Sequence, residues 1–121
     1  MSKFVIRRVN TGVKFDLKAT NGEVIATSEV YDSRAACLNG LKSVRSAAVT
    51  CKVEDQTAAG KLTNPKYEVY RDRSGGWRFR LKARNGKIVA VSESYASRQA
   101  CLDGVESVRK NAPEAEMEDE P

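Results

Sequence analysis

Two segments of this chain alternate apolar and polar residues in the manner of half-buried β-strands. The apolar side chains fall on one face in VKFDLKAT (Phe15, Leu17, Ala19) and in WRFRLKAR (Trp77, Phe79, Leu81, Ala83). A period of two predicts strands. Each segment lies between two further β-prone runs, KFVIRR and EVIATS in one case, KYEVYR and KIVAVS in the other. The Asn-Gly pair after each alternating segment predicts a type I′ hairpin turn, in which both residues adopt positive φ.

The period then changes to that of a helix. Ser33 and Ser97 are suited to N-cap positions. Apolar or small residues follow at i, i+3, i+4 and i+7: Cys37, Gly40, Leu41, Val44 and Cys101, Gly104, Val105, Val108. The two mid-helix glycines each cost about 1 kcal/mol relative to alanine, so we expect them to let the helix approach the sheet closely. Arg45 and Arg109 are expected to complement the helix C-termini.

The two halves of the chain are copies of one unit. Aligned on Asn21-Gly22 and Asn85-Gly86, 19 of the 31 positions from Phe15 to Arg45 match their equivalents from Phe79 to Arg109. The segments VTCKVED and PEAEMED alternate again and predict a fourth strand in each copy. The sequence therefore predicts an α+β single domain, residues 1–121, of two β-β-β-α-β repeats: 1–55 and 66–121, joined by a linker at 56–65.

The repeated pattern F-x-L-K-A-x-N-G, S-E-x-Y-x-S-R and G-x-x-S-V-R resembles the YegP-like family of small bacterial tandem-repeat proteins without assigned function. The match spans both repeats. The resemblance implies one antiparallel sheet built from both repeats, helices on one face, and C-terminal strands exchanged between the halves. It supplies no catalytic or binding residues.

Composition narrows the possible functions. The chain has three cysteines and no histidine. A disulfide framework, a metal site or a bound cofactor is therefore not expected, and the buried Cys37 and Cys101 should be inert thiols. Arg7, Arg8 and Lys14 interrupt any signal-peptide core, and no apolar run is long enough to span a membrane, so we expect a cytoplasmic protein. The duplication already supplies a twofold partner, which favours a monomer.

Catalysis has little support in the sequence. No histidine base, nucleophile elbow or phosphate-binding glycine loop is present. The remaining enzymatic hypothesis is a polar groove formed by Ser28, Glu29, Tyr31, Ser33 and Arg34 with their equivalents Ser92, Glu93, Tyr95, Ser97 and Arg98. The alternative is that these residues pack and pair locally.

A basic strand face is the candidate binding surface. Opposite the apolar side chains of WRFRLKAR lie Arg78, Arg80, Lys82 and Arg84, and Tyr70 could add a ring on which a base stacks. The equivalent first-repeat positions are Lys14, Asp16, Lys18 and Thr20. The net charge of +5 permits a nucleic acid or another polyanion as partner.

Two alternatives stay open for this face. The cations could simply solvate an uncovered sheet. The acidic tail, with Glu114, Glu116 and Glu118, could also mask cations, either on this strand or at Lys14 and Lys18. The sequence leaves the function unknown, with a non-catalytic binding or accessory module as the leading hypothesis and a small enzyme as the alternative.

Overall fold

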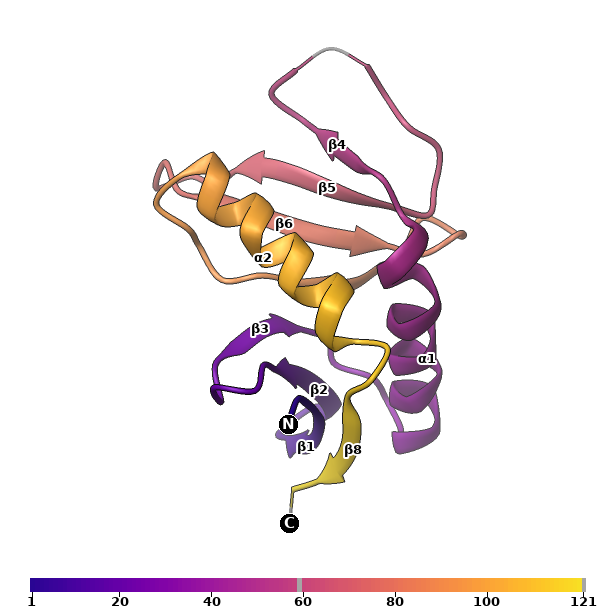
Figure 1. Cartoon of the computed structure of the whole chain (residues 1–121). Coiled ribbons are helices and arrows are strands. Elements are labelled where there is room, and N and C mark those ends of the chain that lie inside the picture. Colours follow the sequence, from indigo (N-terminus) through magenta and orange to yellow (C-terminus); the bar gives the residue numbers. More distant parts are fainter. Residues whose placement is uncertain (59, 121) are drawn as a thin grey trace.

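The computed structural model describes residues 1–58 and 60–120 and contains a first repeat and a second repeat of the same elements (Figure 1). The first repeat comprises β1 (Lys3–Val9), β2 (Gly12–Lys18), β3 (Val24–Thr27), α1 (Arg34–Thr50) and β4 (Val53–Asp55). The second comprises β5 (Lys66–Arg71), β6 (Trp77–Lys82), β7 (Ile88–Val91), α2 (Arg98–Asn111) and β8 (Glu116–Asp119). Both predicted β-β-β-α-β units are confirmed.

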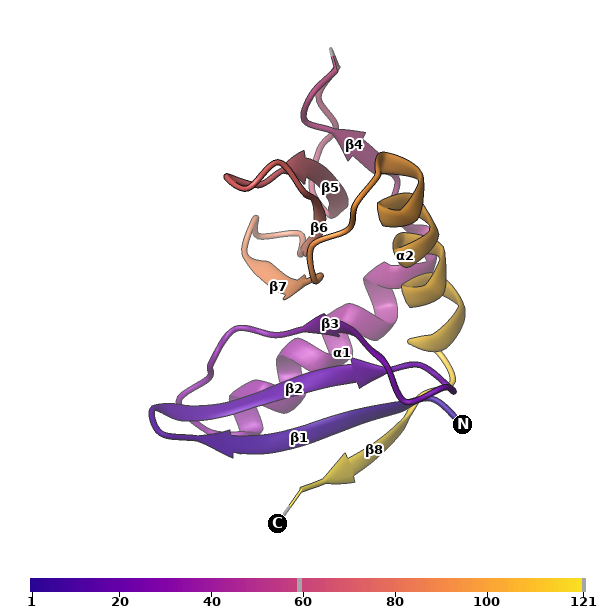
Figure 2. The ribbon, with the colours of Figure 1, turned by 90° about the vertical axis from the view of Figure 1, so that its left-hand side faces the viewer.

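All eight strands form one sheet in the order β4-β5-β6-β7-β3-β2-β1-β8. The halves meet at its centre, where β3 and β7 pair only through Thr27 and Val91. The last strand of each repeat lies beside the first strand of the other, because β4 pairs with β5 and β8 pairs with β1. Helices α1 and α2 pack on the same side of this sheet (Figure 2).

The sheet is mixed, which corrects the expectation of an antiparallel sheet. Both outer pairs, β4 with β5 and β8 with β1, are parallel. Strand alternation carries no information on direction. Direction depends on where the helix delivers the chain, and each helix carries it across to the outer edge of the other repeat (Figure 1).

The core lies between the helices and one face of the sheet. Phe4, Phe15, Tyr67 and Phe79 are fully buried, and Phe4 and Phe15 meet edge to face with ring centroids 5.6 Å apart, as Tyr67 and Phe79 do at 6.1 Å. Edge-to-face contacts of this kind are favourable beyond their burial. Leu17, Leu41 and Leu81 complete the layer, so the predicted apolar faces of strands and helices meet as expected.

The two serine caps are confirmed, whereas the turn type is different. The Oγ atoms of Ser33 and Ser97 accept hydrogen bonds, each at 3.1 Å, from the backbone N–H three residues later. In the Asn-Gly turns only Gly22 and Gly86 have positive φ, at 86° and 82°. The preceding Asn side chain instead accepts a bond from the N–H two residues on. The loop is longer than a two-residue I′ turn, so one left-handed glycine is sufficient.

The mid-helix glycines accommodate a tyrosine ring. A Cβ at Gly40 would lie 2.1 Å from the Oη of Tyr31, and one at Gly104 would lie 2.4 Å from the Oη of Tyr95. The predicted close approach is therefore present. In both repeats its main partner is the aromatic side chain of the segment before the helix.

The repeated arginines hold the repeats together. Arg45 and Arg109 donate hydrogen bonds to the carbonyls of Ala115 and Cys51, which precede the last strand of the opposite repeat. Arg34 at the start of α1 pairs with Asp119 at 2.8 Å, and Arg98 pairs with Asp55 at 2.6 Å. The expected role of Arg45 at a helix C-terminus is wrong, because α1 continues to Thr50.

Candidate functional site

The predicted basic strand face exists, with three of its four cations on β6. Arg78, Arg80 and Lys82 lie on the sheet face opposite the helices, since the intervening Phe79 and Leu81 are fully buried in the core. Their side chains are partly exposed, by 38%, 27% and 24%. The following text calls Arg78, Arg80 and Lys82, with Tyr70, the basic face.

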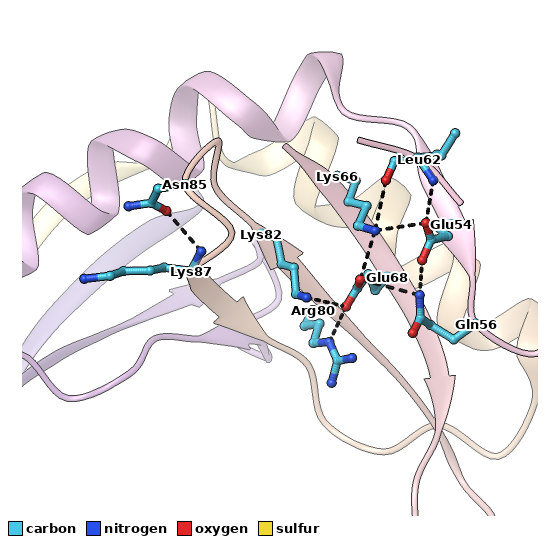
Figure 3. A network of polar contacts seen from close by, with 9 residues as sticks. All are labelled: Glu54, Gln56, Leu62, Lys66, Glu68, Arg80, Lys82, Asn85 and Lys87. Atoms are coloured by element: carbon cyan, nitrogen blue, oxygen red, sulfur yellow. Dashed lines mark hydrogen bonds and ion pairs between the residues drawn. The ribbon is translucent and has the colours of Figure 1, made fainter. Parts of the chain in front are cut away.

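Carboxylates on neighbouring segments pair with these cations, and Figure 3 shows Glu68 with Arg80 and Lys82. Glu68, directly opposite Arg80 in the sheet register, accepts from the Arg80 Nε at 2.6 Å and lies 3.3 Å from the Lys82 Nζ. Arg78 pairs through its Nε with Asp72 at 3.0 Å. Burial alone would raise the pKa of Glu68, but hydrogen bonds from Arg80 and Lys66 outweigh it and lower the pKa. Glu68 is therefore a buried anion beneath the cations.

A second buried carboxylate extends this cluster to the linker (Figure 3). Glu54 on β4 accepts from the backbone N–H of Leu62 and from the Lys66 Nζ at 2.9 Å, and both interactions lower its pKa. Gln56 bridges Glu54 and Glu68. Lys66 is itself 3.1 Å from Glu68, so one ammonium joins two carboxylates. Every charge in this cluster has a partner, which is typical of structural charge networks.

Sequence reasoning missed the cluster formed by Glu54, Lys66 and Glu68. Pairing β5 with β6 across the turn at Gly75-Gly76 would have placed Glu68 opposite Arg80, so that contact had a usable signal. The contribution of Glu54 had none, because it requires the parallel pairing of β4 with β5.

Of the two remaining predicted residues, Tyr70 lies on the basic face and Arg84 does not. Tyr70 lies on the basic face as predicted, with the Arg80 guanidinium 4.4 Å from its ring centroid. Arg84 follows the end of β6 and is exposed in the turn, where it lines a hollow against α1. The expected row of four cations on one face is therefore a row of three.

The acidic tail lies at the far edge of the sheet. Glu118 on β8 pairs with Lys3 at 2.9 Å, and Asp119 pairs with Arg34. Neither predicted target, the β6 cations or Lys14 with Lys18, has a tail carboxylate as its ion-pair partner in the described ranges. The basic face is accordingly not masked by the tail.

Most residues of the Ser-Glu-Tyr-Ser-Arg cluster make contacts that stabilise the fold. Ser28 accepts from the Phe15 N–H and donates to the Glu29 carbonyl, and Ser33 and Arg34 act in the cap and ion pair described above. The Glu29 carboxylate and the Tyr31 hydroxyl have no hydrogen-bond or ion-pair partner among residues 1–58 and 60–120. Both line an open hollow of about 710 Å³, whereas Glu93 and Tyr95 do not, so the two clusters do not form a common groove.

The three cysteines are buried free thiols. Burial raises the pKa of the Cys37 thiol and raises that of Cys101 to about 11. Thiols in this state are poor nucleophiles, which agrees with the predicted inert role. Within the described ranges, no group of three potential ligands suits a metal ion, and neither helix is long and apolar enough to cross a membrane.

The fold and the repeat residues define an α+β tandem-repeat protein whose two units complete one sheet. Residues 9–55 and 72–119 each match the model of a domain of unknown function, DUF1508. A UPF0339 protein of Pseudomonas aeruginosa is 37% identical over 120 residues, covering 98% of this chain and 97% of that protein. The chain belongs to this UPF0339/YegP family.

Two further relatives describe the family's range. The solution NMR structure of yegP from E. coli, described as a protein of unknown function, has a TM-score of 0.82 and 31% identity, covering 98% of this chain and 91% of that chain. A UPF0339 protein of Treponema denticola is 60% identical over 50 residues, which cover 41% of this chain but 86% of that protein. The Treponema protein thus has about the length of one repeat.

Proposed function

We propose that this protein is a non-catalytic binding module and that its basic face binds polyanions such as single-stranded nucleic acid. The observation that best supports this proposal is the geometry of Arg80. Its Nε bonds to Glu68 and its Cζ lies over the Tyr70 ring, 4.4 Å from the centroid, while no bond from its two η nitrogens is present in the described part of the chain. A phosphate could therefore meet a guanidinium already fixed in place.

The surrounding charges support weak binding. Lys82 flanks Arg80 on one side and Arg78 on the other, giving a short positive row on an uncovered sheet face. The carboxylates of Glu68 and Asp72 offset part of that charge, which limits affinity. The same contacts support a non-catalytic role. The buried carboxylates of Glu54 and Glu68 are hydrogen-bonded and have lowered pKa values, so they are poor bases.

The test is a titration of a fluorescent oligothymidylate at several salt concentrations, read by anisotropy. Three phosphate contacts on a single strand predict a slope of log K against log salt of about −2.1. Arg80→Gln/Lys82→Gln removes two cations while each new amide can still donate to Glu68, and the slope should fall to about −0.7.

Lys14→Gln/Lys18→Gln is the matched control, since it removes two cations from the equivalent strand of the first repeat. It should leave the slope unchanged. Circular dichroism and urea unfolding establish that both variants are folded. Absence of binding by the wild type at low salt, or equal losses in both variants, would show that the basic face only solvates the sheet.

A further inference from the structure

The side of α1 that faces the β6–β7 turn is hollowed along its length. Two hollows, of about 710 and 420 Å³, share Ser43, Ala83 and Asn85 as lining residues and therefore adjoin each other. On α1 the lining runs from Ala36 to Thr50, about 21 Å at 1.5 Å per residue. We call these two adjoining hollows the α1 groove. It lies on the helix side of the sheet, away from the basic face.

Two cations form the wall opposite α1. Arg84 and Lys87 project from the turn, both are exposed, and neither has an ion-pair partner among residues 1–58 and 60–120. Figure 3 shows Asn85 and Lys87 in this turn, away from the carboxylate cluster around Glu68. Glu29 at one end is the acidic residue of the lining. The groove is thus a concave site whose two cations have no ion-pair partner within the described ranges, whereas the cations of the basic face are ion-paired.

The groove also offers groups that suit a peptide backbone. Asn39 presents an amide and Ser43 a hydroxyl, which can both donate and accept hydrogen bonds, whereas Asn85 presents its amino group as a donor because its oxygen already accepts from the Lys87 N–H. The Tyr31 hydroxyl, which has no hydrogen-bond partner in the described part of the chain, lines the same space. Peptide recognition of this kind combines backbone hydrogen bonds with pockets for side chains.

The equivalent place in the fold, between α2 and the β2–β3 turn, has a different charge. Thr20 replaces Arg84, Glu23 replaces Lys87, and Asp103 replaces Asn39. The cationic wall is therefore a property of the α1 side alone, although the backbone fold is repeated. This difference provides a control within the same molecule.

From these observations we infer that the α1 groove binds an extended acidic peptide segment of a partner protein. About six extended residues span 20 Å at 3.3 Å per residue, which matches the groove. Acidic side chains would meet Arg84 and Lys87, and the peptide backbone would bond to Asn39, Ser43 and Asn85. A nucleic acid fits less well, because Tyr31 is the one aromatic residue in the lining of the two hollows.

The probe is a fluorescein-labelled hexapeptide of alternating Glu and Val, with the same peptide carrying Lys in place of Glu as comparison. Dissociation constants come from anisotropy on the full chain. We expect the Glu peptide to bind at low salt and the Lys peptide not to bind. Arg84→Glu/Lys87→Glu should weaken binding about tenfold or more, because two attractive pairs become repulsive. Arg8→Glu/Arg73→Glu makes the same change in net charge outside the groove and should weaken it at most about twofold.

A bulky substitution tests whether the peptide occupies the groove itself, without changing the charges of Arg84 and Lys87. Asn39→Trp places a large ring in the groove and should abolish peptide binding, while Asp103→Trp at the equivalent position of α2 should leave it unchanged. Amide shifts in ¹⁵N spectra should appear at α1 and residues 83–89, and Arg80→Gln/Lys82→Gln should have no effect, which distinguishes this site from the basic face.

Three results would overturn the inference. The first is equal loss in Arg84→Glu/Lys87→Glu and Arg8→Glu/Arg73→Glu, which would indicate general charge attraction. The second is unchanged binding in Asn39→Trp, which would place the peptide elsewhere. The third is binding of oligothymidylate, and not of the peptide, that is lost in the groove variants.

Discussion

Replacing Gly40 by alanine should destabilise the protein, although alanine favours a helix. The substitution gains about 1 kcal/mol in helix propensity. Its Cβ, however, would lie 2.1 Å from the Oη and 2.6 Å from the Cζ of Tyr31. Displacing a half-buried ring costs typically about 1–3 kcal/mol. We therefore expect a net loss of about 1 kcal/mol in the free energy of unfolding, measured by urea denaturation.

The Tyr31→Ala background reverses the sign. The three atoms nearest to a Cβ at Gly40 all belong to the Tyr31 side chain, so in its absence Gly40→Ala should stabilise that background by about 1 kcal/mol. The coupling energy of the double-mutant cycle is then about 2 kcal/mol. Gly104→Ala with Tyr95→Ala is the comparison, and its rescue should be incomplete because a Cβ at Gly104 also lies 3.0 Å from Phe79. An additive cycle at Gly40 and Tyr31 would refute the account of this glycine.

Two further predictions concern the whole fold. Residues 66–121 alone lack β1, the partner of β8, so they should be unfolded or should form a homodimer in which β8 pairs with β5 of the second copy and Glu118 meets Lys66; sedimentation analysis showing a folded monomer would contradict this. Stability should be constant at neutral pH and fall below about pH 4, because the pKa values of Glu54, Glu68 and Asp72 are lower in the folded chain, so their contribution is present above the unfolded pKa and is lost on acidification. Urea unfolding at pH 7, 5 and 3.5 measures the loss, and an unchanged stability at pH 3.5 would exclude it.

The predictable features of this fold are those with a local signal. Alternation predicted β2 and β6, the 3.6-residue period predicted α1 and α2, and a serine before each helix predicted its cap. The unpredicted features join distant residues. Tyr31 fits against Gly40 only because the segment before α1 folds back along it, and Arg45 reaches Ala115 only because β8 lies beside β1.

The basic face also combines features that the local sequence predicts with features that depend on distant residues. Outward cations on β6 followed from alternation, because the inward side chains were plainly apolar. Their partner Glu68 depended on strand register, and the separation of Arg84 from the row depended on where β6 ends. A strand end is decided by the turn geometry and the bulge near Leu81, which the alternating pattern does not contain.

Residues that are identical in both repeats maintain the fold, whereas residues that differ between the repeats lie on the candidate binding surfaces. Arg34 and Arg98, Arg45 and Arg109, and the two Gly-Tyr pairs all hold the same contacts in each half, so the fold accounts for their repetition. Differences lie on the uncovered sheet face, where Val5 and Asp16 of the first repeat correspond to Glu68 and Arg80, and in the turn that lines the α1 groove, where Glu23 of the first repeat corresponds to Lys87.

A chain of one repeat would have to form its sheet from two identical copies, and every surface would then occur twice. Joining the copies in one chain removes that constraint, since each half can change its surface while the shared contacts maintain the sheet. The basic face occurs in the second repeat only, and the cationic α1 groove occurs once, between α1 of the first repeat and the β6–β7 turn of the second, as a consequence of such divergence. Binding by this protein is therefore expected at one site of each kind per chain, and a stoichiometry of two equivalent sites in calorimetric titration would contradict both proposals.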